Sequence, residues 1–518
     1  MTYISTQADI LIAGAGPTGL VLAIWLTKLG VRVRIVDKVA EPGTTSRALA
    51  VQARTLEFYQ QIGLAETIVE RGHKVPALNL WVKRVRAARV PLEDMGQGLT
   101  AFSYPVIFPQ DEHERLLIAH LAELGVQVER CLELTGFEDD GQRVLATLRK
   151  SDGSEETSSY AYLAGCDGAR SKVREVLNIG FPGGTYDHLF YIADVEAGGS
   201  PLDGELHVDL DEADFLAVFP LKGTGRARLI GSVRDDVAKD HEHLRFEDVR
   251  DRALRNLQVE VTRVNWFSTY RVHHRVALRF RVGRAFLLGD SAHIHSPVGG
   301  QGMNTGIGDA VNLAWKLAAV LKVPHSVTLL DTYEPERIAF ARRLVATTDR
   351  VFTGVINPSA LARFVRTAVI PSLAPPLFRV SLMRRLAFRT VSQIGVDYRH
   401  SPLSAGKAGK VHGGDRLPWL ALNTPEGDTS NHTPLRSLDW QFHVYGAISA
   451  HLKSVCTDHG IPVHVFPWQP DMAQTGLQHG AIYLVRPDGY VALANAQADE
   501  AAIKAYLSEH NIGATAPP

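Results

Sequence analysis

The chain has 518 residues, of which 45% are hydrophobic, with 55 basic and 56 acidic side chains. This length predicts about three folded domains, and the apolar content excludes a disordered chain. The formal net charge of −1 carries no signature of a nucleic-acid binder or of a polybasic membrane anchor, so we expect no nucleic acid and no membrane as partner.

The three cysteines, Cys131, Cys166 and Cys456, lie far apart and form no C-x-x-C pair. Neither a disulfide framework nor a zinc site is indicated, so we expect no metal and a reducing, cytoplasmic location. The first residues lack the basic start of a signal peptide, and no uninterrupted apolar run reaches the about 18 residues of a membrane-spanning helix.

Residues 8–38 predict one strand–helix–strand unit, which implies a parallel sheet. A short apolar run comes first, a stretch with helical spacing follows, and an alternating run closes on Asp37. The turn between strand and helix reads GAGPTG, whose glycines allow a sharp turn, close approach to a pyrophosphate and close helix–strand packing. The carboxylate of Asp37 suits the hydroxyls of a ribose. By itself this dinucleotide fingerprint does not distinguish FAD from NAD.

The elements that follow change in character along the chain. Residues 111–124 predict a helix with acidic side chains in its first turn. Residues 181–275 consist of short alternating segments and turns, which is typical of an antiparallel sheet inserted into the nucleotide fold. Residues 304–386 are mostly helical in pattern, residues 401–419 are rich in Gly, Pro and Ser and predict a linker, and a small α/β domain follows.

The stretch GRAFLLGDSAHIHSPVGGQGMNTGIGDAVNLAWKL, residues 283–317, predicts a second part of the binding site. An apolar strand places Asp290 at its carboxyl end, where open α/β sheets bind ligands, and a carboxylate there suits the ribityl chain of a flavin. A helix should begin near Gly302 or Met303, with its positive end facing the ligand. Gly299 and Gly300 leave room for the backbone to touch a flat ring.

The sequences G-x-G-P-x-G-L, CDGARSKVR and the stretch at 283–317 together resemble those of the single-component FAD-dependent aromatic hydroxylases, the para-hydroxybenzoate hydroxylase-like superfamily. The resemblance covers residues 8–345 in family order, and the long C-terminal extension is most similar to the phenol hydroxylase and polyketide hydroxylase branch. It implies an α/β fold: a Rossmann-like FAD-binding domain, an inserted antiparallel-sheet substrate domain and a C-terminal thioredoxin-like α/β domain.

The resemblance also implies how the chain divides. The expected parts are the discontinuous FAD-binding domain (1–75, 105–180 and 276–345), the substrate-binding sheet domain (76–104 and 181–275), a helical connection (346–400), a linker (401–419) and a thioredoxin-like domain without C-x-x-C (420–518).

The resemblance implies cofactor roles for motif residues. The fingerprint glycines hold the FAD pyrophosphate and Asp37 its ribose; Arg47 lies near the FAD and the route of the nicotinamide; the Asp-Gly pair at Asp167 relates to both nucleotides. The expected catalytic residues are Arg47, Pro297, Gly299 and Gly300. The expected cofactor-binding residues are Gly14, Gly16, Pro17, Thr18, Gly19, Asp37, Lys38, Arg47, Gln110, Asp167, Gly289, Asp290, Pro297, Gly300, Gly302, Met303 and Asn304.

The substrate should lie between the flavin and the inserted sheet. Phe215, Ala217 and Phe219 share one face of a strand by their period-two spacing, so we expect them to line an apolar pocket. Further expected contacts are Tyr191, His207 and Arg234.

The implied activity is that of a monooxygenase that uses FAD, NADPH or NADH as a transient co-substrate, and O2, to hydroxylate a phenolic or polycyclic aromatic substrate through a flavin C4a-hydroperoxide. The same scaffold could instead carry an epoxidase, a Baeyer–Villiger-type oxygenase or a flavin dehydrogenase or reductase. A flavin-carrying interaction protein without turnover is a further alternative. Either a monomer or a homodimer is expected.

Several conspicuous residues have simpler interpretations. His293 is expected to pack rather than to act as a base, and Trp315, at helical spacing, is expected in the core. The basic run at residues 84–90 is short and alternating, so it predicts an edge strand rather than a binding patch. For Arg170 and Arg174, phosphate binding and an exposed helix face are equally compatible with the sequence.

Overall fold

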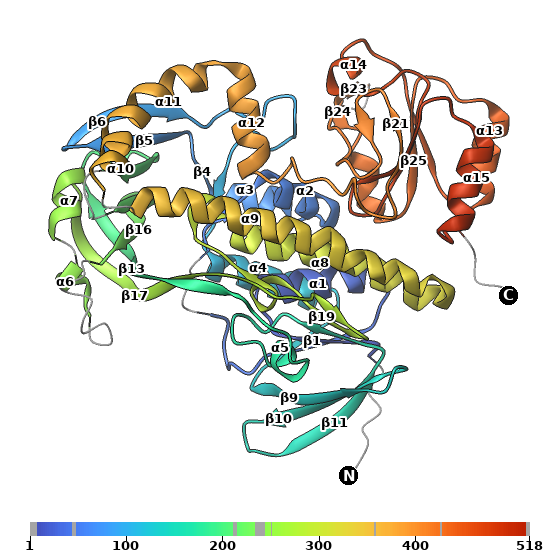
Figure 1. The fold of residues 1–518 in the computed structure, drawn as a ribbon, viewed down its shortest axis with the longest axis horizontal. Coiled ribbons are helices and arrows are strands. Elements are labelled where there is room, and N and C mark those ends of the chain that lie inside the picture. Colours follow the sequence, from blue (N-terminus) through green and yellow to red (C-terminus); the bar gives the residue numbers. More distant parts are fainter. Residues whose placement is uncertain are drawn as a thin grey trace.

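The structure is a computed structural model (Figure 1). It describes residues 8–43, 48–210, 215–233, 244–249, 251–356, 359–424 and 427–513. Within these ranges, every helix is too short or too polar to cross a membrane.

A six-stranded sheet forms the centre of the nucleotide-binding fold. Its order is β18 (Arg281–Val282), β19 (Ala285–Leu287), β12 (Tyr162–Gly165), β1 (Ile10–Ala13), β2 (Val33–Val36) and β8 (Val128–Glu129). All neighbours are parallel except β18, which runs antiparallel at one end. Because parallel strands end at the same edge, Gly14, Asp37, Asp167 and Asp290 come together there. We call this the carboxyl edge.

Helices cover this sheet and position its loops. α1 (Pro17–Lys28) starts earlier than its apolar spacing suggests, because Pro17 occupies the first helical position, where a missing N–H costs nothing. α8 (Gly302–Lys322) begins where the sequence predicts and packs beside α1 and α9 (Tyr333–Ile356). The other helices of this region are α2 (Ala53–Ile62), α3 (Ala65–Arg71), α4 (Gln110–Glu123) and α5 (Lys172–Val176).

Two small three-stranded sheets flank the central one. The first, β11 (Glu155–Tyr160), β10 (Val144–Lys150) and β9 (Leu132–Asp139), is the separate layer at the bottom of Figure 1. The second consists of β3 (Ala50–Val51), β7 (Val106–Ile107) and β4 (His73–Lys74).

The inserted sheet has eight strands. Its order is β20 (His293–Ile294), β17 (Glu260–Val276), β13 (Gly183–Gly198), β16 (Arg226–Ser232), β15 (Leu216–Pro220), β14 (Leu206–Asp209), β5 (Ala77–Val82) and β6 (Val85–Pro91). β6, which contains residues 85–90 of the basic run, is the terminal strand, as predicted. One face is covered by two short helices, α6 (Phe246–Val249) and α7 (Asp251–Leu257). β20 lies directly before residues 297–304, so this sheet and the expected flavin loop are continuous in the chain.

After α9, three helices lie on the outside of the molecule, near β5 and β6 (Figure 1). They are α10 (Ala360–Phe364), α11 (Ile370–Arg379) and α12 (Ser381–Val391). Together with α8 and α9 they account for the helical pattern of residues 304–386.

The C-terminal domain contains a mixed sheet of order β22 (Val411–His412), β21 (Ala405–Ala408), β28 (Val491–Asn495), β27 (Ile482–Val485), β25 (Gln441–Tyr445) and β26 (Val463–Phe466). β25 and β26 are parallel, and β27 and β28 form an antiparallel pair beside them, which is the thioredoxin-like arrangement. The remaining elements are a hairpin of β23 (Ala421–Thr424) and β24 (Gly427–Ser430) and the helices α13 (Ala450–Asp458), α14 (Met472–Thr475) and α15 (Glu500–Glu509).

The prediction that residues 401–419 form a linker is wrong. β21 and β22 lie in this range, and β21 pairs in parallel with β28. The glycines of this segment serve tight turns and close contacts: a Cβ on Gly413 would lie 2.3 Å from the backbone nitrogen of Ala405.

Buried charges join the C-terminal domain to the helices beneath it. Arg486, fully buried, donates to both carboxylate oxygens of Glu336 on α9, at 2.9 and 3.0 Å. Glu336 also accepts from Lys316 on α8 at 2.8 Å. The neighbouring carboxylate of Asp488 accepts from the Trp315 indole at 3.1 Å, which places Trp315 in the core, as predicted.

Candidate functional site

The fingerprint loop is shaped by steric limits on its glycines. Gly14 has φ +102°, and a Cβ there would lie 2.3 Å from the carbonyl oxygen of Cys166. A Cβ on Gly19 would lie 2.0 Å from the carbonyl oxygen of Gly14. A Cβ on Gly16 would meet no atom within 4 Å, so the chain leaves open space there, directly before the uncapped N-terminus of α1. Open space beside free N–H groups suits a phosphate.

Asp37 lies at the end of β2, as predicted. Its carboxylate accepts from the backbone N–H of Ala15 at 2.7 Å and from that of Val39 at 3.0 Å. The carboxylate therefore fixes the fingerprint loop, and its contact with a ribose stays a prediction. The neighbouring Lys38 is exposed.

The Gly-Asp turn after β19 meets the fingerprint helix directly. A Cβ on Gly289, which has φ +60°, would lie 2.7 Å from the hydroxyl of Thr18, and one on Gly306 of α8 would lie 2.3 Å from it. Thr18 is therefore enclosed by two remote segments of the chain. Asp290 itself is exposed at the carboxyl edge, and its contact with a ligand stays a prediction.

Buried charges below this turn hold it to α8. Asp309 accepts from the N–H of Gly289 at 2.9 Å, from His293 Nε2 at 2.7 Å and from Arg337 Nε at 2.6 Å. Burial acts to raise the pKa of Asp309, but Arg337 holds it below its usual value. His293 is buried with this partner, so it packs, as predicted, and is not positioned as a base.

The glycine-rich loop before α8 is bonded to the strand that precedes α2. Asn304 accepts from the N–H of Gln52 at 2.9 Å and donates to the carbonyl of Ala50 at 2.9 Å, while Gln52 Nε2 donates to the carbonyl of Gly299 at 2.9 Å. Gly299 and Gly300 have φ +76° and +61°, and a Cβ on Gly300 would meet that of Ala50 at 2.7 Å. Only glycine fits this close approach.

The other residues expected to line the ring stand around this loop. Pro297 is exposed, and Gly302 and Met303 are half-buried at the start of α8. The ring of His295 lies 3.7 Å from the place of a Cβ on Gly302, and burial lowers the pKa of His295 to about 4. The N-terminus of α8 has no side-chain cap, so its N–H groups are available to a ligand.

Gln110 and Asp167 complete the edge. Gln110 Oε1 accepts from the N–H of Ala48 at 3.1 Å, and Gln110 Nε2 donates to Glu114 at 2.8 Å. Asp167 accepts from the N–H of Val173 at 3.1 Å, and burial raises its pKa. Its other carboxylate oxygen, Oδ1, is buried and has no hydrogen-bond partner among the described residues. An unpaired buried acceptor at a ligand edge fits a ligand hydroxyl.

These observations fit FAD: open space at Gly16, an exposed Asp290, an unpaired Asp167 oxygen and two uncapped helix N-termini. Two expected site residues, Arg47 and Arg234, lie outside the described residues.

Arg170 and Arg174, whose roles the sequence does not decide, differ in environment. Arg174 donates to the carbonyls of Ser291 at 2.9 Å and Ala169 at 2.7 Å, and its guanidinium lies 4.0 Å from the centre of the Phe181 ring. It therefore joins the turn after Asp167 to the turn after Asp290. Arg170 is exposed.

The register of β15 with β16 shows where the three apolar residues expected to line the pocket lie. Phe215, Ala217 and Phe219 lie on the same face of the eight-stranded sheet. Phe215 packs near Phe352 of α9, and Phe219 packs against the cluster around Leu49 and Ile107, which belongs to the nucleotide-binding part. We call this the inner face, because it is the face turned toward the cofactor segments.

Tyr191 and His207, the other expected substrate contacts, do not lie on the face of the predicted triad. Tyr191 pairs with Gly231, and His207 pairs with Val218, so both point to the opposite, outer face. Tyr191 packs among the core residues under α6 and α7, and His207 accepts from the indole of Trp81 at 2.9 Å. Both are almost fully buried. Alternation within one strand fixes a face, but only pairing shows which face that is.

Sequence reasoning missed a buried ion pair on the inner face. Arg228 is paired in register with Phe219 and donates to both oxygens of Asp194, at 2.6 and 2.7 Å. Its Nη1 also reaches the carbonyl of Ala48 at 3.5 Å. Arg228 is fully buried, whereas the Asp194 side chain is 24% exposed. An arginine between apolar residues in an alternating strand was the available signal.

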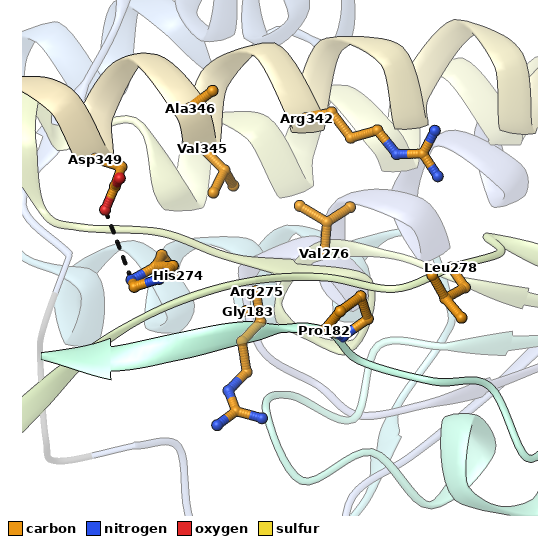
Figure 2. Close-up of a pocket in the computed structure, with 10 residues that line it drawn as sticks. All are labelled: Pro182, Gly183, His274, Arg275, Val276, Leu278, Arg342, Val345, Ala346 and Asp349. Atoms are coloured by element: carbon orange, nitrogen blue, oxygen red, sulfur yellow. Dashed lines mark ion pairs between the residues drawn. The ribbon is translucent and has the colours of Figure 1, made fainter.

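A surface hollow of about 300 Å³ lies between α9 and the ends of β13 and β17 (Figure 2). His274 stands 3.7 Å from Asp349 across it. The ten residues that line this hollow include none of the expected cofactor or substrate residues.

Comparisons with known proteins agree with this geometry. Residues 7–348 match the family model described as FAD binding domain, and residues 411–511 match the model described as aromatic-ring hydroxylase, C-terminal. The chain is 36% identical to 6-methylpretetramide 4-monooxygenase of Streptomyces rimosus, over 93% of this chain and 90% of that protein. It is 32% identical to pentachlorophenol 4-monooxygenase of Sphingobium chlorophenolicum, over 66% and 64%.

Among solved structures, the OxyS anhydrotetracycline hydroxylase from Streptomyces rimosus is similar, with a TM-score of 0.78 and 30% identity over 98% of this chain and 99% of that one. Sequence, fold and site thus agree over nearly the whole length. The chain belongs to the FAD-binding aromatic-ring hydroxylases, and it is an FAD-dependent aromatic monooxygenase.

Proposed function

We propose that this monooxygenase hydroxylates a polycyclic phenol, with NADPH or NADH as transient reductant and O2 as the oxygen source. The observation that carries the proposal is the inner face, where an apolar triad stands beside the ion pair of Arg228, which is fully buried, and Asp194. Apolar and aromatic walls with few polar groups suit a flat ring system that carries one oriented oxygen. The polyketide-directed names of the relatives support the polycyclic class. We further propose a cytoplasmic enzyme that acts as a monomer or homodimer.

FAD, when bound, supplies the activated oxygen. The carboxyl edge would hold the cofactor through backbone groups, Asp37 and Asp290. The N-terminus of α8 would present positive charge to the bound cofactor. The inner face excludes water through Phe215 and Phe219. Asp194, held in one orientation by Arg228, accepts a hydrogen bond from a phenolic hydroxyl of the substrate.

A screen of simple phenols and polycyclic phenols tests this function. The measurement is stimulated NADPH and NADH consumption by the FAD-loaded enzyme, followed by product mass in ¹⁸O-labelled oxygen. We expect the largest stimulation with a polycyclic phenol and one labelled oxygen atom per product. Stimulation without label in the product, or by monocyclic phenols alone, would contradict the proposal.

The ion pair is tested by a double variant, Asp194→Asn with Arg228→Gln, which keeps hydrogen-bonding groups but removes both charges. We expect KM for the substrate to rise about tenfold, the loss of one charge-assisted bond, with FAD binding unchanged. The matched control is Glu205→Gln with Arg89→Gln, which likewise replaces both charged side chains by amides, at an ion pair near the far end of the sheet. Equal KM values in both variants would argue that Asp194 and Arg228 serve only the fold.

A further inference from the structure

The helices α10–α12 expose an unusual share of the large apolar side chains of this chain. Eleven of the nineteen exposed large hydrophobic residues of the described chain lie between residues 361 and 391, so the exposure is concentrated rather than scattered. These residues are Leu361, Phe364, Val365, Ile370, Leu373, Leu377, Val380, Leu382, Met383, Leu386 and Val391. Single exposed apolar residues are normal, but a contiguous group marks an interaction surface.

The spacing shows that the apolar side of each helix faces outward. On α11, Ile370, Leu373 and Leu377 follow each other at intervals of three and four and are all 40% exposed or more. On α12, Leu382 and Leu386 repeat the pattern, at 62% and 51%. The inward residues, such as Phe388 against Gly96, already fasten these helices to the fold. The outward stripe therefore does not serve the protein's own core.

Positive charge accompanies the stripe. Residues 351–396 contain six arginines and no acidic residue, although at the chain average of 56 acidic residues in 518 a stretch of this length would hold about five. Arg363, Arg379, Arg385 and Arg389 are exposed, and in the described part of the chain none of them forms an ion pair. The near-zero net charge of the whole chain conceals this local excess.

A second copy of the chain is an unfavourable binding partner for the exposed surface of α10–α12. In a two-fold dimer the same patch meets itself, so the arginines of one copy would face those of the other at close range. An acidic protein would complement the positive charge of this surface. The apolar residues, however, follow three successive helices over the outside of the molecule (Figure 1) and do not gather in one groove that such a protein could fill. A bilayer interface needs no matching shape, and arginine side chains can reach lipid phosphates while leucines enter the acyl region.

We propose that α10–α12 form a docking surface for an anionic phospholipid membrane, on which the enzyme lies without spanning it. The apolar stripe supplies buried area, and the arginines supply attraction to acidic headgroups, each worth roughly fivefold in affinity. This surface is distinct from the carboxyl edge and from the inner face, so docking leaves the reaction site in place. The proposal replaces our composition-based expectation that a membrane is not a partner.

Vesicle flotation of the FAD-loaded enzyme tests the proposal. The probes are vesicles of phosphatidylglycerol mixed with phosphatidylcholine, and vesicles of phosphatidylcholine alone. We expect binding to the anionic vesicles, weakened by salt, and at least tenfold weaker binding to the neutral ones. Leu373→Gln with Leu377→Gln, and Arg385→Gln with Arg389→Gln, should each reduce binding at least tenfold.

The matched controls are Val465→Gln and Arg436→Gln, exposed positions of the C-terminal domain, which should bind like the natural chain. FAD content and melting temperature of every variant confirm folding. No flotation with anionic vesicles, or equal binding by both double variants and the controls, would overturn the proposal. So would a dimer in solution that the leucine variant dissociates, combined with no vesicle binding, because the stripe would then serve self-association.

Discussion

The carboxyl edge, to which we assign the cofactor, and the inner face of the eight-stranded sheet, to which we assign the substrate, are built from different chemical groups. The edge consists mainly of backbone: glycines without room for a Cβ, helix N-termini without caps and strand ends that converge. The inner face consists of side chains from strands whose pairing decides what points where. Backbone sites tolerate few substitutions, whereas a side-chain surface can change its specificity without disturbing the fold.

The largest effect is expected for Gly19→Val, a substitution in the backbone-built carboxyl edge. Its Cβ would meet the carbonyl oxygen of Gly14 at 2.0 Å, and neither backbone can move without opening the fingerprint loop. We expect no retained FAD and a loss of stability of about 3 kcal/mol or more. Absorbance at 450 nm and thermal unfolding measure both. A control is Gly30→Ala: a Cβ there meets no atom within 4 Å, so only the strain of its positive φ, about 1 kcal/mol, remains.

A second prediction removes a side chain from the same edge. Asp290→Ala leaves the turn intact, because Gly289 and Asp309 hold it, but removes the exposed carboxylate. We expect FAD affinity to fall about a hundredfold, the loss of one charged hydrogen bond to a ligand hydroxyl. Titration of the apoprotein by flavin fluorescence gives the dissociation constant. A variant purified fully yellow with unchanged affinity would remove Asp290 from the site.

The two faces of the sheet can be compared at neighbouring residues. Phe219→Leu changes the inner face, and we expect KM for the aromatic substrate to rise about tenfold with little change in stability. Val218→Ala changes the outer core, and we expect about 2 kcal/mol lower stability with KM unchanged. Steady-state kinetics and denaturant unfolding separate the two. The reverse outcome would mean that the substrate lies on the side of Tyr191 and His207.

The smallest effect concerns pH. Burial lowers the pKa of His295 to about 4, so this ring beside the start of α8 stays neutral from pH 8 down to 6. A histidine of ordinary pKa near 6.5 would gain positive charge over that range and tighten binding of the anionic cofactor. We expect FAD affinity to be flat within about twofold between pH 6 and 8. A clear increase toward pH 6 would show that a titrating group contributes to the edge.

Prediction from sequence succeeded where the physics is local. The fingerprint turn, the helix start at Gly302 and the acid after the strand at Asp290 each depend on a few neighbouring residues. Prediction failed where the pairing of strands that are distant in sequence determines the face to which a side chain points. Tyr191 and Ala217 obey the same alternation, but their pairing sends them to opposite faces, and the partner of Arg228 is 34 residues away. The strands at 405–412 were hidden by turn residues that also typify linkers.

The buried ion pair between Arg486 and Glu336 also limits how the C-terminal domain could be gained or lost in evolution. Removing the C-terminal domain would leave Glu336 without its arginine partner and the indole of Trp315 without Asp488. Trp315 lies on α8, the helix whose N-terminus we assign to the cofactor site. The C-terminal domain thus helps to hold α8 in place. A homologue without this domain would need other residues, such as apolar ones, where Glu336 and Trp315 lose their partners.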